Sequence, residues 1–459
     1  MRASHSPDQG VATSLICALQ KIPNLTMDSA RLHFLDALAV GVLAAVHGPV
    51  SGVTQLQQSF NCGQSSVFGR EEPANPAMAA LINGTLIHSL EFDDTHVPSV
   101  MHGSSVLASA ALACAENEQA TVEELIRAYA IGWEFLIRIG LASPGKIQAN
   151  GFQITSAGGP FAAATVACLL KKYSADVMSN AIGIAGSQAA GTFAFLAEGD
   201  TVKSAQPGWA AHAGILAADL ARAGVTGPAD VFRGEFGFYS LYAKDHSGGQ
   251  RLLDSMMDLG EQWYLPEAAF KLIPSCHYIH PFVEAVQQAI DSGLDAAEIE
   301  NLHCWVPAEV TGIIAEPWNA KIQPRTSHDA RWSLPYVLSA VFLDGDVGVD
   351  LFSGPTREDV TKLAELMTFQ PWVGSGYPEQ FPARIQITTR DETVSEYAVF
   401  DVKGGVGRPI QKSDVVAKAS RNLQGAGWDE SRINGFTDVI LQRDETSVSE
   451  LTAFLRSSQ

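Results

Sequence analysis

The chain has 459 residues, of which 46% are hydrophobic and 17% are charged, and its formal net charge is -20. This composition is typical of a folded globular protein with enough apolar material for more than one core. The negative charge argues against nucleic acid and against an anionic membrane surface as partners, because both would repel the chain. A small anionic substrate remains compatible with it, since a single pocket can be locally cationic.

The cysteines and the N-terminal residues allow a prediction of the cellular compartment. Six cysteines are scattered without a CxxC pair, which favours reduced thiols in the cytoplasm over a disulfide framework or a zinc site. The opening stretch "MRASHSPDQG" lacks the apolar core of a signal peptide. The longest apolar run, residues 37–46, is shorter than the roughly 20 residues of a membrane span, so we predict a buried helix there.

Up to about residue 265 the sequence predicts a succession of helices rich in alanine, glycine and serine, which implies close helix packing. Pro76, Pro160 and Pro207 suit the first turn of a helix, and Gly224 suits the position just after a helix end. The predicted helices span residues 27–46, 76–90, 104–116, 121–141, 160–171, 176–197 and 208–223.

From about residue 267 the pattern changes to mixed structure. Residues 301–308 and 383–400 show the alternation and β-branched content of strands, and the second stretch predicts a hairpin that turns at residues 390–393. Further helices are predicted near residues 281–292, 329–343, 356–367, 413–423 and 447–458.

These patterns predict a mainly α protein with an α+β second domain. We expect a discontinuous helical domain and a smaller α+β lid domain. The expected boundaries are residues 1–266 and 405–459 for the helical domain and residues 267–404 for the lid.

No familiar nucleotide or hydrolase motif is present. The glycine-rich stretch "KGGVGRP" is not followed by GK[ST], and "GIAGSQAAG" lies inside a predicted helix rather than after a strand. A GxSxG nucleophile elbow is also missing. Chemistry must therefore come from other side chains or from a metal.

An acidic loop follows the helix predicted from Pro76. If that helix ends near Leu90, then Glu91, Asp93 and Asp94 lie at the negative end of its dipole, where carboxylates need a nearby cation. His102 stands at the start of the next predicted helix, and a helix N-terminus is a natural anion site.

Two further segments bring cations toward predicted helix starts. Lys203 precedes a helix expected from Pro207, while Lys271, His277 and His280 precede one expected from Pro281. If these segments converge with His102, they form an anion pocket with potential proton acceptors, because a lysine close to other cations is a better base. The acidic loop would then orient or partly neutralise the cluster.

Plainer interpretations stay open at this point. A single lysine or histidine before a helix is usually a solvated or capping residue, and an acidic stretch can simply end a helix. Asp93, Asp94, His96 and His102 also include metal-ligand types. Their spacing fits no standard ligand pattern, so we predict no metal.

Five stretches together resemble the MmgE/PrpD family in order and spacing. The stretches are "LEFDDTH", "NGFQITSAGGPFAAAT", "KSAQPGWAAHAGILAADLARAGVTGPADVF", "FKLIPSCHYIHP" and "WSLPYVLSAVF". The resemblance covers nearly the whole chain. It implies a large helical domain built from both chain ends, a smaller α+β lid, a cleft between them, a homodimer, and action on small di- or tricarboxylates without a cofactor.

The resemblance also implies which residues form the site. Carried over by position, the catalytic set would be His102, Lys203, Lys271, Asp93 and Asp94. The substrate-binding set would be Glu91, Thr95, Gln153, His277 and Tyr278.

Three departures from the family pattern bear on the reaction. Gln153 stands in "GFQIT" where many dehydratases and decarboxylases of the family have GFH, Gln206 replaces a common histidine, and Glu91 replaces a frequent aspartate. Loss of two imidazoles weakens the case for dehydration, which needs a general acid for the leaving hydroxyl. Proton abstraction beside a carboxylate remains.

We therefore expect a cofactor-independent epimerase acting on iminodisuccinate. Lys271 and His102 would be bases on opposite faces, Lys203 would bind carboxylate, and Asp93 and Asp94 would orient the other groups. The alternative within the family is a dehydratase or decarboxylase of a tricarboxylate of the 2-methylcitrate or cis-aconitate type. A metal-dependent hydrolase and a non-catalytic helical scaffold are the alternatives outside it.

Overall fold

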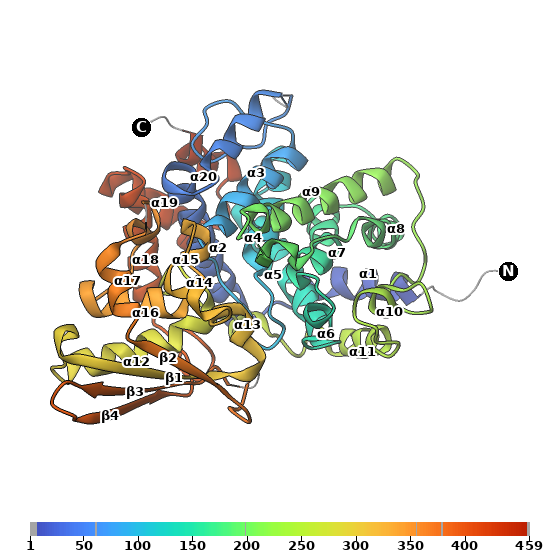
Figure 1. Ribbon diagram of the computed structural model, residues 1–459. Coiled ribbons are helices and arrows are strands. Elements are labelled where there is room, and N and C mark those ends of the chain that lie inside the picture. Colours follow the sequence, from blue (N-terminus) through green and yellow to red (C-terminus); the bar gives the residue numbers. More distant parts are fainter. Residues whose placement is uncertain (1–6, 60–61, 198, 355, 378–379, 457–459) are drawn as a thin grey trace.

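Helices dominate the computed structural model, and one small sheet lies at one end of the molecule (Figure 1). The helices and this mixed sheet of four strands confirm the predicted fold class, which is mainly α with a small α+β part. The structure describes residues 7–59, 62–197, 199–354, 356–377 and 380–456.

Two hydrophobic cores hold these elements together. The larger one draws its residues from positions 11–268 and from positions 419–455, so both chain ends contribute to it. The smaller core is formed within residues 273–399. The first core is built almost entirely from helices, and the second lies around the sheet.

The first core is assembled from long helices that pack closely. Glycines mark the closest approaches, since a Cβ on Gly208 of α9 would lie 2.2 Å from the carbonyl oxygen of Leu81 on α3. These helices are α1 (Pro7–Ala18), α2 (Asn24–His47), α3 (Pro76–Ser89), α4 (Gly103–Asn117), α5 (Val122–Leu141), α7 (Ile154–Leu170), α8 (Ala175–Ala185) and α9 (Val202–Arg222). Short helices α6 (Lys146–Ala149), α10 (Phe238–Tyr242) and α11 (Gly248–Ser255) connect them.

Several helix ends follow the signals in the sequence. Asn75 caps α3 by accepting a hydrogen bond from the Met78 amide, with Pro76 in the first turn. Thr121 and Glu124 form a reciprocal capping box at the start of α5. These caps satisfy amides that have no partner inside the helix.

Two predicted helix starts are wrong. Pro160 and Pro207 lie inside α7 and α9 rather than in their first turns, because α7 already begins at Ile154 and α9 at Val202. The packing of these two helices against each other extends them beyond what the prolines suggest. The helix predicted for residues 176–197 is also too long, since α8 ends at Ala185 and only two short 3₁₀ turns follow.

The apolar run near residue 40 belongs to α2, which is longer than the sequence suggested. Of the described helices, α2 alone has the length and apolar composition of a membrane span, but 78% of its most apolar window is buried inside the protein. Buried charged groups such as Asp36 lie on it as well. It is a core helix, as predicted.

The sheet has the strand order β2-β1-β3-β4 and contains β1 (Ile299–Pro307), β2 (Met367–Trp372), β3 (Ala383–Thr389) and β4 (Val394–Val399). Strands β3 and β4 form the predicted hairpin, with Ile385 opposite Tyr397. Strand β2 was not predicted, and it pairs in parallel with β1.

Helices cover one side of this sheet. Helix α12 (His280–Asp291) packs on β3 and β4, and α16 (Leu334–Asp344) packs on α12 (Figure 1). The segment predicted as one helix over 329–343 is divided, because α15 (Ser327–Ala330) ends before Ser333 caps α16. The other helices of this part are α13 (Thr311–Ile314), α14 (Trp318–Ile322) and α17 (Glu358–Ala364).

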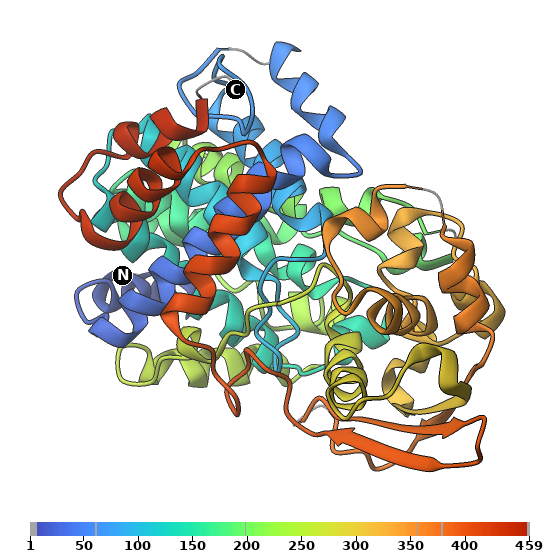
Figure 2. The same cartoon turned by 90° about the vertical axis from the view of Figure 1, so that its left-hand side faces the viewer.

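The end of the chain returns to the first core. Helix α18 (Lys412–Gly425) packs along α2 (Figure 2). Helix α19 (Glu430–Gln442) contacts both α2 and α18, and α20 (Val448–Arg456) contacts α19. Helix α20 also packs on α4 and α5. Residues more than 300 positions apart are thereby brought together around the acidic loop, residues 91–95, as the Lys418–Phe92 contact shows.

Candidate active site

The acidic loop connects α3 to α4, and its three carboxylates are buried. Glu91, Asp93 and Asp94 are each at most 1% exposed. Glu91 has a φ of 52°, and Val100 farther along the same connection has a φ of 55°. Left-handed backbone at a non-glycine residue costs free energy and clusters at functional sites, above all for a β-branched residue such as valine.

Glu91 is held between two lysines from distant parts of the chain. Lys203 Nζ donates to Glu91 Oε1, and Lys271 Nζ donates to the Glu91 carbonyl at 3.1 Å and to Oε2 at 3.4 Å. Burial raises the pKa of Glu91, but the two ammonium groups more than offset it and hold that pKa well below its usual range. Glu91 is therefore a carboxylate that fixes both cations.

Lys203 has two further contacts. Its Nζ lies 2.9 Å from His88 Nε2 and 4.7 Å from the centre of the Trp332 ring. His88 Nδ1 lies 2.7 Å from Asp93 Oδ2, and since a carboxylate oxygen accepts, Nδ1 carries the proton and Nε2 accepts from Lys203. A continuous chain of contacts thus runs from Asp93 through His88 and Lys203 to Glu91.

His102 is the N-cap residue of α4 and stands beside this chain. Its Nδ1 lies 3.1 Å from the Asp94 carbonyl, which can only accept, so the hydrogen bond places the ring proton on Nδ1. Burial lowers the pKa of His102 well below its usual range, although Asp93 opposes the shift. His102 is therefore a neutral imidazole whose Nε2 has no hydrogen-bond partner among the described residues.

These groups face one cavity of about 490 Å³. It lies where α4, α7 and α9 meet the segment before α12 and the loops of the second core. Its described lining consists of Glu91, Thr95, Val97, Val100, His102, Gly145, Gln148, Ala149, Gln153, Ile154, Phe193, Phe195, Leu196, Lys203, Lys271, Cys276, His277, Tyr278, Glu309, Val310, Ile313, Trp332, Tyr377 and Phe381.

Eight of the ten predicted site residues line this cavity. They are Glu91, Thr95, His102, Gln153, Lys203, Lys271, His277 and Tyr278. Gln153 is the N-cap residue of α7, and its Nε2 lies 3.3 Å from His88 Nε2. His277 is 4% exposed, and burial followed by the charge of Lys271 lowers its pKa to about 3.

Asp93 and Asp94 are placed behind the cavity wall rather than on it. Asp93 binds His88, and its pKa is low because His88 and His102 more than offset the effect of burial. Asp94 accepts from the Ser104 amide at 3.2 Å and so caps the start of α4, while its other oxygen lies 2.7 Å from His33 Nδ1. It orients His102 through its carbonyl, not through its carboxylate.

The position of Lys203 also differs from the prediction. It lies in the first turn of α9 instead of preceding a helix at Pro207. Lys271 lies in an irregular segment whose start is fixed by a bridge between Thr95 and Ala269. The two lysines therefore meet through contacts with Glu91, and a shared position at helix N-termini does not describe them both.

No pattern in the sequence pointed to His88, which lies inside α3 and looks like a core residue. Arg331 was also missed: it is 1% exposed, and its Nη1 donates to the carbonyls of Leu90 and Pro274, so it fixes both segments that carry Glu91 and Lys271. Its neighbour Trp332 belongs to the stretch "WSLPYVLSAVF". That stretch was the only available signal for this part of the site.

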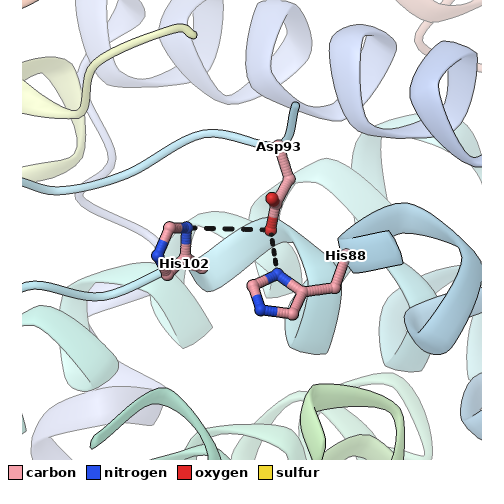
Figure 3. Close-up of side chains that lie close together, drawn as sticks. All are labelled: His88, Asp93 and His102. Atoms are coloured by element: carbon pink, nitrogen blue, oxygen red, sulfur yellow. Dashed lines mark hydrogen bonds and ion pairs between the residues drawn. The ribbon is translucent and has the colours of Figure 1, made fainter. Parts of the chain in front are cut away.

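Three groups could hold a metal ion by geometry. His88, Asp93 and His102 each offer a ligand atom within 4.8 Å of the other two, and Figure 3 shows Asp93 between the two imidazoles. His88 Nδ1 donates to Asp93, however, and His102 Nδ1 donates to the Asp94 carbonyl. A metal bound through these nitrogens would require both rings to give up those protons.

Two family models match most of the chain. The MmgE/PrpD N-terminal domain matches residues 16–249, and the MmgE/PrpD C-terminal domain matches residues 273–439. The chain belongs to the MmgE/PrpD family. The second match extends beyond the sheet into α18 and α19, although these helices pack on the first core.

Curated relatives of this MmgE/PrpD protein are similar over almost their full length. Cis-aconitate decarboxylase of Aspergillus terreus is 27% identical, over 96% of this chain and 95% of the relative. Cis-aconitate decarboxylase-like protein oryM of Aspergillus oryzae is 27% identical over 99% of both chains. Cis-aconitate decarboxylase of Mus musculus is 26% identical, over 93% of this chain and 88% of the relative. These relatives give no support to the predicted iminodisuccinate epimerase and favour the alternative reaction.

Proposed function

We propose that this protein is a lyase that removes carbon dioxide from a small unsaturated polycarboxylate of the cis-aconitate class, using its own side chains. The observation that carries the proposal is the arrangement of Lys203 and Lys271 on the two oxygens of Glu91, beside a neutral His102, in one cavity. The full-length similarity to decarboxylases supports this reaction over the epimerisation.

The lysines have the right number of free donors for this role. An ammonium group has three N–H donors, and the described contacts of Lys203 use two of them, on His88 and Glu91. Those of Lys271 also use two, both on Glu91. One N–H of each lysine thus remains for a substrate carboxylate.

Such a site fits the electron flow of the reaction. The bond from the departing carboxylate to its CH₂ carbon breaks, and its electron pair forms a new C=C bond. The pair of the original double bond moves to the carbon beside a second carboxylate, where it takes up a proton. Fixed cations stabilise the negative charge that develops on that carboxylate.

The roles follow from the contacts. Lys203 is held on two sides and lies over Trp332, so it binds and stabilises the carboxylate. Lys271 hydrogen-bonds to Glu91 alone among the described residues, and its remaining N–H holds the departing carboxylate; once carbon dioxide has left, that N–H donates the proton to carbon. His102, with its unprotonated Nε2 in the cavity, accepts a hydrogen bond or a proton from the substrate.

The test is an NMR assay in deuterium oxide. Enzyme dialysed against EDTA is incubated with cis-aconitate, and we expect release of carbon dioxide with one solvent deuterium in the product. Lys271→Met should abolish the reaction, while Lys172→Met, which changes a lysine with a 78% exposed side chain outside the cavity lining, should leave it intact. Full activity of Lys271→Met would contradict the proposed role of Lys271.

Epimerisation stays a second candidate because of Gln153. This amide, which cannot transfer protons, occupies the cavity wall next to His88, at the position where many dehydratases and decarboxylases of the family have a histidine. His102 could still take a proton beside a carboxylate. In the same assay with iminodisuccinate, deuterium exchange and stereoisomer conversion without carbon dioxide would identify this reaction.

A further inference from the structure

The charges that line the cavity are few and cancel one another. Among the described lining residues, only Lys203, Lys271, Glu91 and Glu309 carry formal charge, two of each sign. Both lysines are already paired with Glu91. Arg331 has a buried guanidinium, which donates to the carbonyls of Leu90 and Pro274, and it does not line the cavity.

This balance is poor for a compact tricarboxylate. Three carboxylates would enter with three negative charges, whereas the lysines have one free N–H each. A charge taken from water without a partner costs several kcal/mol. Two carboxylates, one on each lysine, are the most that cations of the described lining can pair, because its other polar groups, such as Gln148 and His277, are neutral.

Much of the remaining wall is apolar, and part of it reaches the surface. Phe193, Phe195 and Leu196 come from the 3₁₀ turn before α9, and Val310 and Ile313 come from the turns after β1. Phe195 is buried, while Leu196 is 43% exposed and marks where the wall meets solvent. A volume of about 490 Å³ lies in the range of cavities that bury ligands much larger than a six-carbon acid.

The chemistry itself needs only two carboxylates. One leaves as carbon dioxide, and the second takes up charge as the double bond moves. In cis-aconitate the third carboxylate is attached to the central carbon and takes no part in the electron flow. An apolar group can replace it without changing the bonds that form and break.

We infer that the preferred substrate is an unsaturated dicarboxylate with an apolar chain at that central carbon, that is, a 3-alkylglutaconate. This inference rests on the proposed function and specifies its substrate class. The two carboxylates pair with Lys203 and Lys271, and the chain lies along the wall formed by Phe193, Phe195 and Ile313.

The test compares kcat/KM for carbon dioxide release across a homologous series. The substrates are 3-methyl-, 3-propyl- and 3-hexylglutaconate, with cis-aconitate as the 3-carboxy comparator. Burial of apolar surface predicts a rise of about fourfold per methylene, and 3-hexylglutaconate should exceed cis-aconitate. If cis-aconitate is the best substrate and chain length has no effect, the inference is overturned and the proposed lyase activity stands. If none of these acids releases carbon dioxide, both the inference and the proposed function are overturned.

A pair of matched variants locates the chain in the cavity. Phe193→Ala should lower the ratio of kcat/KM for 3-hexyl- over 3-methylglutaconate about tenfold, because it removes wall surface. Phe236→Ala makes the same truncation at a side chain that is 82% exposed and not on the cavity wall, so this ratio should not change. An unchanged ratio in Phe193→Ala would place the chain elsewhere and contradict the inference.

Discussion

Lys418, on α18 in the last part of the chain, donates a hydrogen bond of 2.9 Å to the carbonyl of Phe92 in the acidic loop. The same ammonium group lies 2.8 Å from Asp36 Oδ2 on α2 and 4.0 Å from the centre of the Phe92 ring. Both charged side chains are buried. The end of the chain thus fixes the loop that carries Glu91.

Replacement of Lys418 by methionine should therefore affect stability and the site together. Loss of one partner leaves Asp36 buried without its cation, which costs about 3 to 5 kcal/mol in the free energy of unfolding. Urea denaturation measures this loss, and a decrease in kcat should accompany it. The double variant Lys418→Met with Asp36→Leu should lose much less stability, because it removes both charges. An equal loss in single and double variants would show that the pair itself is not responsible.

The catalytic role of His102 can be tested through its tautomer. NMR of the protein with ¹⁵N-labelled histidine should show a neutral ring with the proton on Nδ1, persisting below pH 6.5 because burial lowers its pKa. His102→Gln removes the free basic nitrogen and should reduce kcat/KM by roughly 10² to 10⁴.

The matched control for this change is His246→Gln, which alters an exposed histidine bonded to Ser240. It should leave kcat/KM unchanged. If His102→Gln retains full activity, the imidazole is not the group that exchanges a proton with the substrate.

Much of the fold could be predicted because its helices are marked locally. Asn75 with Pro76, and Thr121 with Glu124, are caps that need only adjacent residues. Strand β2 escaped prediction because Pro371 interrupts its alternation, and its pairing with β1 depends on a segment more than 60 residues away. Pro160 and Pro207 led to wrong predictions of two helix starts, because tertiary packing extends α7 and α9 through these prolines.

The residues of the site also fall into those that could be predicted from the sequence and those that could not. Glu91 could be singled out because carboxylates after a helix need cations. Lys203 and Lys271 stood out because they precede predicted helices and match the family pattern. The interaction of His88 with Lys203 depends on how α3 and α9 pack, so no local pattern shows it. The apolar wall at Phe193 and Phe195 was hidden for a similar reason, since that segment was predicted to continue a helix.

Helix α4 offers a test of backbone strain outside the site. Gln119, the residue after the C-cap Glu118, has a φ of 56°, and the hydrogen bond from the Ala120 amide to the Ala115 carbonyl shows the turn in which glycine is usual. Gln119→Gly should raise the free energy of unfolding by about 1 kcal/mol, since the left-handed conformation is costly for other residues.

The opposite substitution, of a glycine by another residue, can be made at the end of α9. Gly224 has a φ of 96°, and the Val225 amide bonds to the Leu220 carbonyl in the same type of turn. Gly224→Ala should destabilise the protein by a similar amount. Equal thermal midpoints for the two variants and the parent would contradict this account of both helix ends.

Acid should destabilise the fold below pH 6.5 through its buried histidines. Burial lowers the pKa of each of them in the native state: His96, His102, His277, His280 and His328. As pH falls below 6.5, the unfolded chain binds protons that the native state does not. The free energy of unfolding therefore falls, as the pH is lowered, by about 1.4 kcal/mol per pH unit for each histidine that is still neutral in the native state.

His328 is the clearest single contributor to this pH dependence. It is 2% exposed, its ring nitrogens have no hydrogen-bond partner among the described residues, and burial lowers its pKa to about 4. His328→Phe keeps an aromatic ring but cannot titrate, so between pH 6.5 and 4 the slope of stability against pH should fall by about 1.4 kcal/mol per unit. Urea denaturation at successive pH values measures the slope, and the exposed His246→Gln should leave it unaltered. If His328→Phe showed the same slope as the parent protein, His328 of the parent would be protonated in the native state over this pH range, contrary to the effect expected from its burial.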